Sequence, residues 1–294
     1  MIKKLRGRRK RVWRKALLCA VFLLAFWMPA HPVEFHLKLG GGLTWFRPID
    51  VNRAVRDWVE WHELESARNE NWTYLGGSTP DIRLGYNFEG ELQFFLIPRL
   101  AFSVGAGFLY ADLSAKDTEI LINKKQGPTQ LVQPRTLSAI PLVFSLYTHL
   151  PLNRRFSVYA KAGAGMAWAK HIEREGSKKE TGKNYNYSLE ENASARNPVY
   201  QAGLGLDFAL ESGVRFFLEG SYRWLRMTGF SGETGEGETG TLYHFEELSP
   251  DLGFWQAKNR LSTEPPVGEN IRSVRETEVD FSGFTLIVGI AIKF

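Results

Sequence analysis

The chain has 294 residues, of which 44% are hydrophobic and 13% aromatic, and it contains 28 glycines. Its net charge of +5 is misleading, because nine lysines and arginines lie in residues 1–30, which hold no acidic residue; removing these nine charges from +5 leaves −4. A basic surface for nucleic acid is therefore excluded, and the abundance of glycine and aromatic residues favours an all-β protein.

The N-terminus has the order of a secretory signal. Residues 1–15 are basic, residues 16–27 (ALLCAVFLLAFW) are apolar, and Pro29 and Ala30 follow as a cleavage region. The apolar run is too short for a spanning helix, which needs roughly 20 residues. We expect residues 1–30 to be a cleaved signal peptide, with an uncleaved anchor as the alternative, and residues 31–294 to form one domain. The single cysteine, Cys19, lies in this segment, so the mature chain has no disulfide framework.

The rest of the chain repeatedly alternates apolar residues with small or polar ones, which is typical of strands with two different faces. Eight segments show this pattern: 35–45, 82–94, 102–110, 142–147, 157–168, 200–208, 215–224 and 284–294. The last segment is the clearest, with Leu286, Val288, Ile290 and Ile292 on one face and Ile287 as an exception on the other. Tilted membrane strands of about 9–11 residues have this length.

The composition of the two faces indicates which solvent each one meets. One face is aliphatic and aromatic, and the other carries glycine, small polar residues and a few charges of both signs. The second face has too much glycine and too little charge for an aqueous exterior. We therefore expect the small and polar residues to fill a narrow lumen, while the apolar face meets lipid.

The links between the segments alternate in length. Residues 96–100, 150–155 and 211–214 are short turns, whereas 47–80, 112–134, 172–198 and 229–280 are long, polar and expected to be irregular. This asymmetry predicts an eight-stranded antiparallel up-and-down transmembrane β-barrel with short periplasmic turns and four long external loops.

Residues 34–294 resemble the small outer-membrane barrels of the OmpA/OmpX/OmpW type. The resemblance implies a location in the bacterial outer membrane, among its lipid and lipopolysaccharide, and dependence on the secretion and barrel-assembly machinery. It also implies that a terminal aromatic residue with apolar residues at alternate positions before it is the assembly signal, which Val288, Ile290, Ile292 and Phe294 match. The external loops are longer than in the smallest members, and we expect no peptidoglycan-binding domain after the barrel.

Charged residues on the inner face are candidates for a network of ion pairs in the lumen. These residues are Arg83, Glu89, Glu91, Lys161, Asp207, Glu219 and Arg223. Eight strands leave an interior filled by side chains, so a structural network is the expected role, and a narrow path for small solutes is the alternative.

Three features of the long links are further candidates. Asp50 is a good N-cap for a helix in which Val51, Val55, Trp58, Val59 and His62 sit at helical spacing. This helix is expected to pack on the rim, and the alternatives are that it plugs the barrel mouth, lies on the outer leaflet or binds a partner. The run at 232–240 (GETGEGETG) lacks the ligand order of a calcium loop and is expected to be flexible. Glu246 and Glu247, which follow the aromatic run 243–245, form a candidate adhesive patch.

These observations predict a non-enzymatic outer-membrane protein with a structural role in the envelope or a role in surface binding and adhesion, in which an extracellular ligand binds the external loops. A channel for small or apolar solutes is the first alternative, and a lipid A-modifying enzyme is the second, with His62, His171 and His244 as its candidate bases. We expect no catalytic residue, cofactor or metal.

Overall fold

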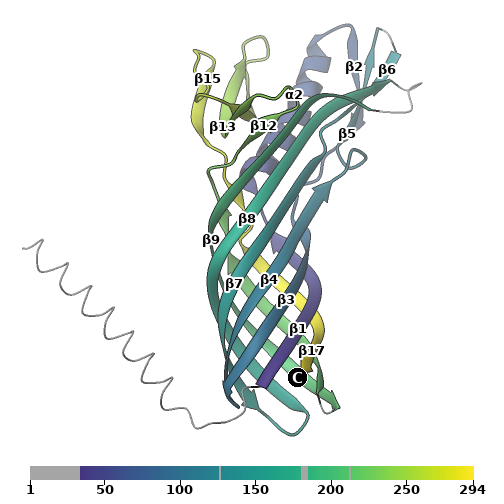
Figure 1. Cartoon of the computed structure of the whole chain (residues 1–294). Helices are drawn as coiled ribbons and strands as arrows, with labels where there is room; N and C mark the ends of the chain where they lie inside the picture. The colour runs from purple at the N-terminus through teal and green to yellow at the C-terminus, as the bar shows by residue number, and fades with distance from the viewer. Residues whose placement is uncertain (1–33, 126, 180–184, 212) are drawn as a thin grey trace, which may run out of the picture.

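A computed structural model describes residues 34–125, 127–179, 185–211 and 213–294, so the predicted signal peptide at 1–30 lies outside the described residues. Long strands pair edge to edge in a closed ring, in the order β1 (Glu34–Phe46), β3 (Leu84–Ile97), β4 (Leu100–Leu113), β7 (Arg135–Pro151), β8 (Phe156–Lys179), β9 (Asn186–Glu211), β10 (Val214–Trp224) and β17 (Gly283–Lys293). Every pairing in this order is antiparallel, and β17 pairs with β1 to close the ring (Figure 1). The predicted all-β class is confirmed.

The two faces of the ring strands have different surroundings. On β1, Leu39, Leu43 and Trp45 are between 37% and 44% exposed, whereas Lys38 and Thr44 are 4% and 0% exposed. Large apolar side chains are exposed in this way on the outside of all eight ring strands. So much uncovered apolar surface is typical of a barrel whose outside meets hydrocarbon.

Glycines on the inner face let neighbouring strands approach closely. A Cβ added at Gly165 would lie 1.9 Å from the carbonyl oxygen of Leu142, and one added at Gly42 would lie 1.8 Å from that of Leu286. A larger residue at either position would force the paired strands apart. The glycine-rich face therefore sets the spacing of the wall as well as lining the lumen.

One end of the ring carries tight turns. β3 ends at Ile97 and β4 begins at Leu100, while between β7 and β8 the Asn153 carboxamide oxygen accepts from the backbone N–H groups of Arg155 and Phe156, at 2.8 and 2.9 Å. Gly213, just before β10, has φ +109°, which favours glycine. These three connections lie where the sequence predicts short turns.

The opposite end carries a folded head, defined here as α2 (Ile49–Arg68), β2 (Trp72–Gly77), β5 (Glu119–Lys124), β6 (Gly127–Val132), β11 (Arg226–Met227), β12 (Ser231–Thr234), β13 (Thr239–Ser249), β14 (Phe254–Ser262), β15 (Ile271–Glu276), β16 (Val279–Asp280) and the adjoining ends of β8 and β9. On one side β6, β5 and β2 add in turn to β8, and on the other side β12, β13 and β14 add to β9 (Figure 1). The head is therefore a continuation of the barrel wall.

The four predicted links are long, but the prediction that they are irregular is wrong, because strands and one helix occupy most of their described residues. Residues 172–179 and 186–198 continue β8 and β9, and Glu173 pairs in register with Glu191. Some of the added strands pair as hairpins, such as β5 with β6, and others pair with strands far away in the chain, such as β2 with β5. A strand depends on such pairing and packing, so a short polar segment gives little evidence of it by itself.

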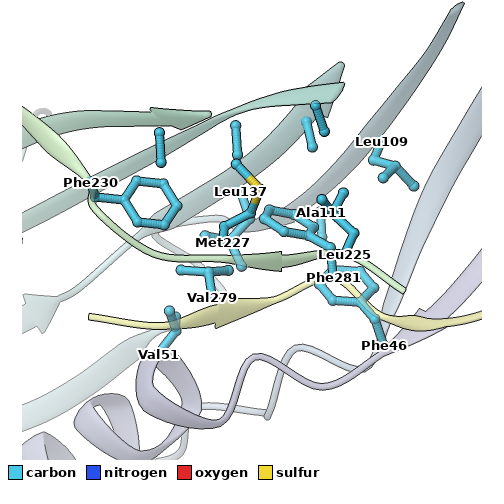
Figure 2. Packing of buried hydrophobic residues seen from close by; sticks show 14 of the residues in the cluster. Phe46, Val51, Leu109, Ala111, Leu137, Leu225, Met227, Phe230, Val279 and Phe281 are labelled. Atoms are coloured by element: carbon cyan, nitrogen blue, oxygen red, sulfur yellow. The ribbon is translucent and has the colours of Figure 1, made fainter. Parts of the chain in front are cut away.

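An apolar plug fills the end of the barrel interior below the head. Phe46, Leu109 and Leu137 of the wall meet Leu225, Met227, Phe230, Val279 and Phe281 of the head, together with Val51 at the start of α2 (Figure 2). The plug residues of the head come from 225–230 and 279–281, within or next to a segment expected to be a polar loop. Ile82, predicted on the lipid-facing side, is instead 3% exposed in this cluster, because the Asn52 side chain pairs with its backbone N–H and carbonyl at 2.8 and 3.0 Å.

The helix predicted after Asp50 is present, but its cap differs from the prediction. The N-cap residue is Pro48, without a side-chain cap, and Asp50 lies in the first turn. Val51, Val55, Trp58 and His62 form the buried face, as their spacing predicts. Among the residues that the structure describes, no helix is long and apolar enough to cross a membrane.

Candidate functional site

A cluster of charged side chains occupies the middle of the barrel interior. The Glu219 carboxylate lies 2.6 Å from Lys38 Nζ and 2.5 Å from Lys161 Nζ. It also accepts a 2.9 Å hydrogen bond from the Tyr159 hydroxyl, and Lys161 Nζ lies 3.1 Å from Glu91. Four strands of the ring thus converge on one pair of ammonium groups.

Glu89 and Arg223 extend the cluster towards the head. Arg223 Nη2 lies 2.7 Å from Glu89 Oε1, and Glu89 Oε2 lies 3.5 Å from Lys161 Nζ. With Lys38, Glu91 and Glu219 the cluster holds three cations and three carboxylates, so its formal charge is zero. Buried ions require such pairing, because removing them from water costs several kcal/mol each.

The structure brings together five of the seven residues predicted for the lumen: Glu89, Glu91, Lys161, Glu219 and Arg223. Arg83 is a wrong prediction, because it precedes β3, its side chain is 71% exposed, and it contacts Asp81 at 3.1 Å. Asp207 is inside the barrel but apart from the cluster, where it faces Ser157 at 3.4 Å and His149 at 3.7 Å near the tight turns.

Lys38 was missed as a member of the network, although its inner-face position in the first segment was readable. Its ammonium group bonds the Tyr159 hydroxyl at 2.7 Å and lies over the rings of Tyr159 and Phe217, 4.3 and 4.1 Å from their centroids. Alternation placed the residue on the inner face, but its partners lie on strands far away in the chain.

The four residues of the candidate assembly signal lie on the outside of β17 and just after it. Val288 is 60% exposed and Phe294 is 73% exposed, while Ile287 points inward and is 1% exposed. The Phe294 N–H donates to the Phe35 carbonyl at 2.9 Å, so the end of the chain is tied to the strand that closes the ring.

The head contains a pocket of about 380 Å³ between α2, the β13–β14 hairpin and the mouth of the barrel. Its floor is built around Arg135 and Glu173, which are 1% and 2% exposed. Arg135 Nη2 lies 2.7 Å from Glu173 Oε1, and Arg135 Nη1 donates to the Val51 carbonyl at 2.6 Å. Gln133 Nε2 also donates to Glu173 Oε1, at 2.9 Å. No residue of this floor was predicted, because Gln133, Arg135 and Glu173 lie in or beside segments expected to be loops.

Ion pairs and hydrogen bonds fasten α2 to other elements of the head beside the pocket. Arg275 donates two 2.5 Å hydrogen bonds to the Asp50 carboxylate, and the Glu278 N–H donates a third at 3.0 Å. Burial raises the pKa of Asp50, but these hydrogen bonds outweigh it, so the pKa lies below its usual value. Further along, the Ala257 N–H donates to Asp57 Oδ2 at 2.9 Å.

One wall of the pocket is aromatic. Trp58, Trp61 and His62 of α2 form it, and the His62 ring centroid lies 4.6 Å from that of Trp58 and 4.7 Å from that of Trp61. Burial lowers the pKa of His62, so the ring is neutral at pH 7. Its Nδ1 pairs with the Trp58 carbonyl at 2.8 Å, which leaves Nε2 as an acceptor.

The candidate adhesive patch is a wrong prediction for most of its members. His244, Phe245 and Glu246 are only 2% to 6% exposed. Glu246 pairs with Arg53 of α2 and, at 2.5 Å, with Arg272 of β15, while His244 Nδ1 pairs with Asn259 at 2.9 Å. These side chains therefore hold the head together.

No protein-family model matches the chain, and no curated protein matches it. Among solved structures, the chain is similar to the attachment invasion locus protein Ail of Yersinia pestis, in complex with the heparin analogue sucrose octasulfate (11% identity, 88% of this chain and 99% of that chain, TM-score 0.34). It is also similar to a major outer membrane protein of Thermus thermophilus (11% identity, 90% and 100%, TM-score 0.42) and to the outer membrane protease OmpT of Escherichia coli (9% identity, 89% and 96%, TM-score 0.32).

These neighbours are bacterial outer-membrane proteins. The closed ring and its apolar exterior agree with the predicted resemblance to outer-membrane barrels and with the predicted location in the outer membrane. Similarity of this degree carries no ligand or reaction over to the chain. The prediction that the chain is not an enzyme is contradicted at the level of the architecture alone, because the outer-membrane barrels to which the chain is similar include a protease as well as non-enzymes. Barrel architecture therefore does not exclude catalysis.

Proposed function

We propose that this protein is a surface-binding protein of the outer membrane, in which the eight-stranded barrel is the anchor and the head is the binding module. In this proposal residues 1–30 are a cleaved signal peptide, the tight turns face the periplasm and the head lies outside the cell. The exposed apolar face of β1 from Phe35 to Trp45 supports a strand that crosses the membrane, since a tilted membrane strand needs about 9–11 residues.

The observation that carries the proposal is the contrast between a barrel that is filled at its middle and a hollow head. A second pocket, of about 470 Å³, lies at the tight-turn end of the barrel, and the charge cluster separates it from the head. Inside the barrel, Lys161 is in contact with three carboxylates, and the apolar plug lies between this cluster and the head. The head, in contrast, encloses a pocket of about 380 Å³, within the range of small-molecule sites of about 300–1,000 Å³. The arrangement supports binding on the head over passage of solutes through the barrel.

Outer-leaflet lipid is the second partner in the proposal. Arg47 and Lys170 are exposed and lie two residues beyond the exposed aromatics Trp45 and Trp168, while Arg196 lies over the Trp168 ring, 5.0 Å from its centroid. Cations just beyond an aromatic girdle are placed for the phosphate groups of lipopolysaccharide. The barrel-assembly machinery is the proposed reader of Val288, Ile290, Ile292 and Phe294.

Planar-bilayer recording tests the contrast between anchor and channel. The full mature chain, inserted into a planar bilayer, should give no unitary current, whereas a trimeric porin in the same bilayer gives clear steps. Stepwise currents from the purified protein would refute the anchor role and favour a solute channel.

A further inference from the structure

We infer that the head pocket binds an uncharged saccharide of one or two rings. This inference rests on the proposed role of the head as a binding module, and it adds the chemical class of the ligand. Three properties of the pocket lining support this inference: an aromatic wall, charged side chains that are paired with one another, and buried hydrogen-bond donors and acceptors without partners.

The aromatic wall suits a molecule with an apolar face. A pyranose ring presents C–H groups on its faces and hydroxyl groups around its edge. Trp61 is half-buried, so part of its ring surface is open towards the pocket, whereas Trp58 is 4% exposed and donates its indole N–H to Glu175 at 3.3 Å. Tryptophan combines a large apolar surface with low conformational entropy, which suits it to stack on such a ring.

The charged side chains of the lining are already paired with one another. Arg135 pairs with Glu173 at 2.7 Å, Lys258 with Glu247 at 2.6 Å and Arg260 with Glu175 at 3.5 Å. An anionic or cationic ligand would have to compete with these pairs, and desolvating its charge would add a further cost. A ligand without net charge avoids both costs.

Several polar atoms on the lining residues have no hydrogen-bond partner within the described chain. The donors are Arg135 Nε, Asn259 Nδ2 and Arg260 Nη1, and the acceptors are Gln133 Oε1 and Glu173 Oε2. Four of these five residues are at least nine-tenths buried, and leaving a buried polar atom unpaired costs free energy. These atoms are almost shielded from water at the base of the lining, so a ligand reaches them only as it seats against that base. A hydroxyl group both donates and accepts and can pair with either kind of atom, whereas a carboxylate only accepts and an ammonium group only donates.

The pocket walls are held in place before any ligand arrives. Asp57 of α2 accepts from the Ala257 N–H of the opposite wall. Next to the pocket lining, Asp50 and Arg53 of α2 pair with Arg275 of β15 and Glu246 of β13. A preformed site loses little conformational entropy on binding, which matters for a small ligand with few contacts.

The test is ligand-observed NMR and calorimetry on the full mature chain in detergent micelles, with galactose, N-acetylglucosamine and lactose as probes. Glutamine and inorganic phosphate serve as the zwitterionic and anionic arms. At least one saccharide should bind saturably with a dissociation constant of about 1 mM or tighter. Arg260→Gln and Trp61→Ala should each weaken that binding by about tenfold, the equivalent of one hydrogen bond or stacking contact, and Trp61→Phe should restore part of it.

Arg226→Gln is the matched control, because Arg226 is a 66% exposed arginine of β11 in the head that pairs with Glu278 at 3.1 Å, outside the pocket lining. It should bind saccharide as the parent does. The inference is overturned if none of the three saccharides saturates, if only phosphate or glutamine binds, or if Arg260→Gln and Trp61→Ala leave saccharide affinity unchanged. Unitary currents would overturn the anchor role separately, so the two failures are distinguishable.

Discussion

Lys161 is the centre of the buried charge cluster, and its replacement by methionine tests whether the cluster holds the barrel together. The Lys161 side chain is 0% exposed and its Nζ lies 2.5, 3.1 and 3.5 Å from Glu219, Glu91 and Glu89. Lys161→Met would leave three carboxylates facing two cations in a site screened from water. Removing one partner from a buried ion pair costs about 3–5 kcal/mol, and we expect a loss of this size in the free energy of unfolding.

The assay is urea unfolding of the folded protein in lipid vesicles, followed by tryptophan fluorescence and by migration of unboiled samples on SDS gels. The double variant Lys161→Met with Glu219→Gln restores equal numbers of buried charges. The double variant should lose less free energy of unfolding than the sum of the losses of the two single variants, by about 2 kcal/mol, because the two residues interact directly. A loss below about 1 kcal/mol for Lys161→Met, or strictly additive losses, would refute the reasoning.

Three further predictions follow from the wall, the head and the last strand. Gly165→Ala should lower the free energy of unfolding by about 1–3 kcal/mol, because the added Cβ would lie 1.9 Å from the Leu142 carbonyl oxygen. In the control Gly90→Ala the added Cβ would lie 3.4 Å from Leu39 Cδ2, and the free energy of unfolding should change by about 0.5 kcal/mol or less. Equal losses for the two variants in urea titrations would contradict this. Asp50→Asn should increase proteolysis of α2 at neutral pH. Because the pKa of Asp50 is depressed in the folded protein, its stabilisation is complete above the unfolded pKa and is lost as pH falls through the folded pKa. The proteolysis rates of the parent and Asp50→Asn should therefore become equal in acid, and a difference that persists there would count against the Arg275 contact. Phe294→Ser should lower the amount of heat-modifiable protein in the outer membrane several-fold, while Lys293→Ser should not, and immunoblots of membrane fractions with equal levels for both would reject Phe294 as an assembly signal.

The ring strands were predictable from the sequence because each one carries its own evidence. A strand between lipid and a narrow lumen must alternate at every position, so segments such as 284–294 reveal both their structure and the side each residue faces. The inner position of Glu219 and the outer position of Leu218 could both be read in this way.

The head and its pocket were not predictable, because their evidence lies in contacts between distant segments. Arg135, Glu173 and Arg260 are ordinary charged residues in the sequence, and they become a pocket lining only when β7, β8 and β14 meet α2. Asp50 illustrates the same limit. Its residue type predicts an N-cap, but the two hydrogen bonds from Arg275 place it in a tertiary ion pair that local pattern does not encode.

The central claim is that the head faces the outside of the cell and the tight turns face the periplasm. Because the single cysteine, Cys19, lies in the predicted signal peptide, a cysteine introduced into the mature chain would be unique. Glu236→Cys in the β12–β13 hairpin and Asn153→Cys in the β7–β8 turn can be treated with a large polymer-linked maleimide that does not cross the outer membrane. In intact cells Glu236→Cys should be labelled, and Asn153→Cys should be labelled only after the outer membrane is permeabilised. Labelling of Asn153→Cys in intact cells, with Glu236→Cys protected, would contradict the account.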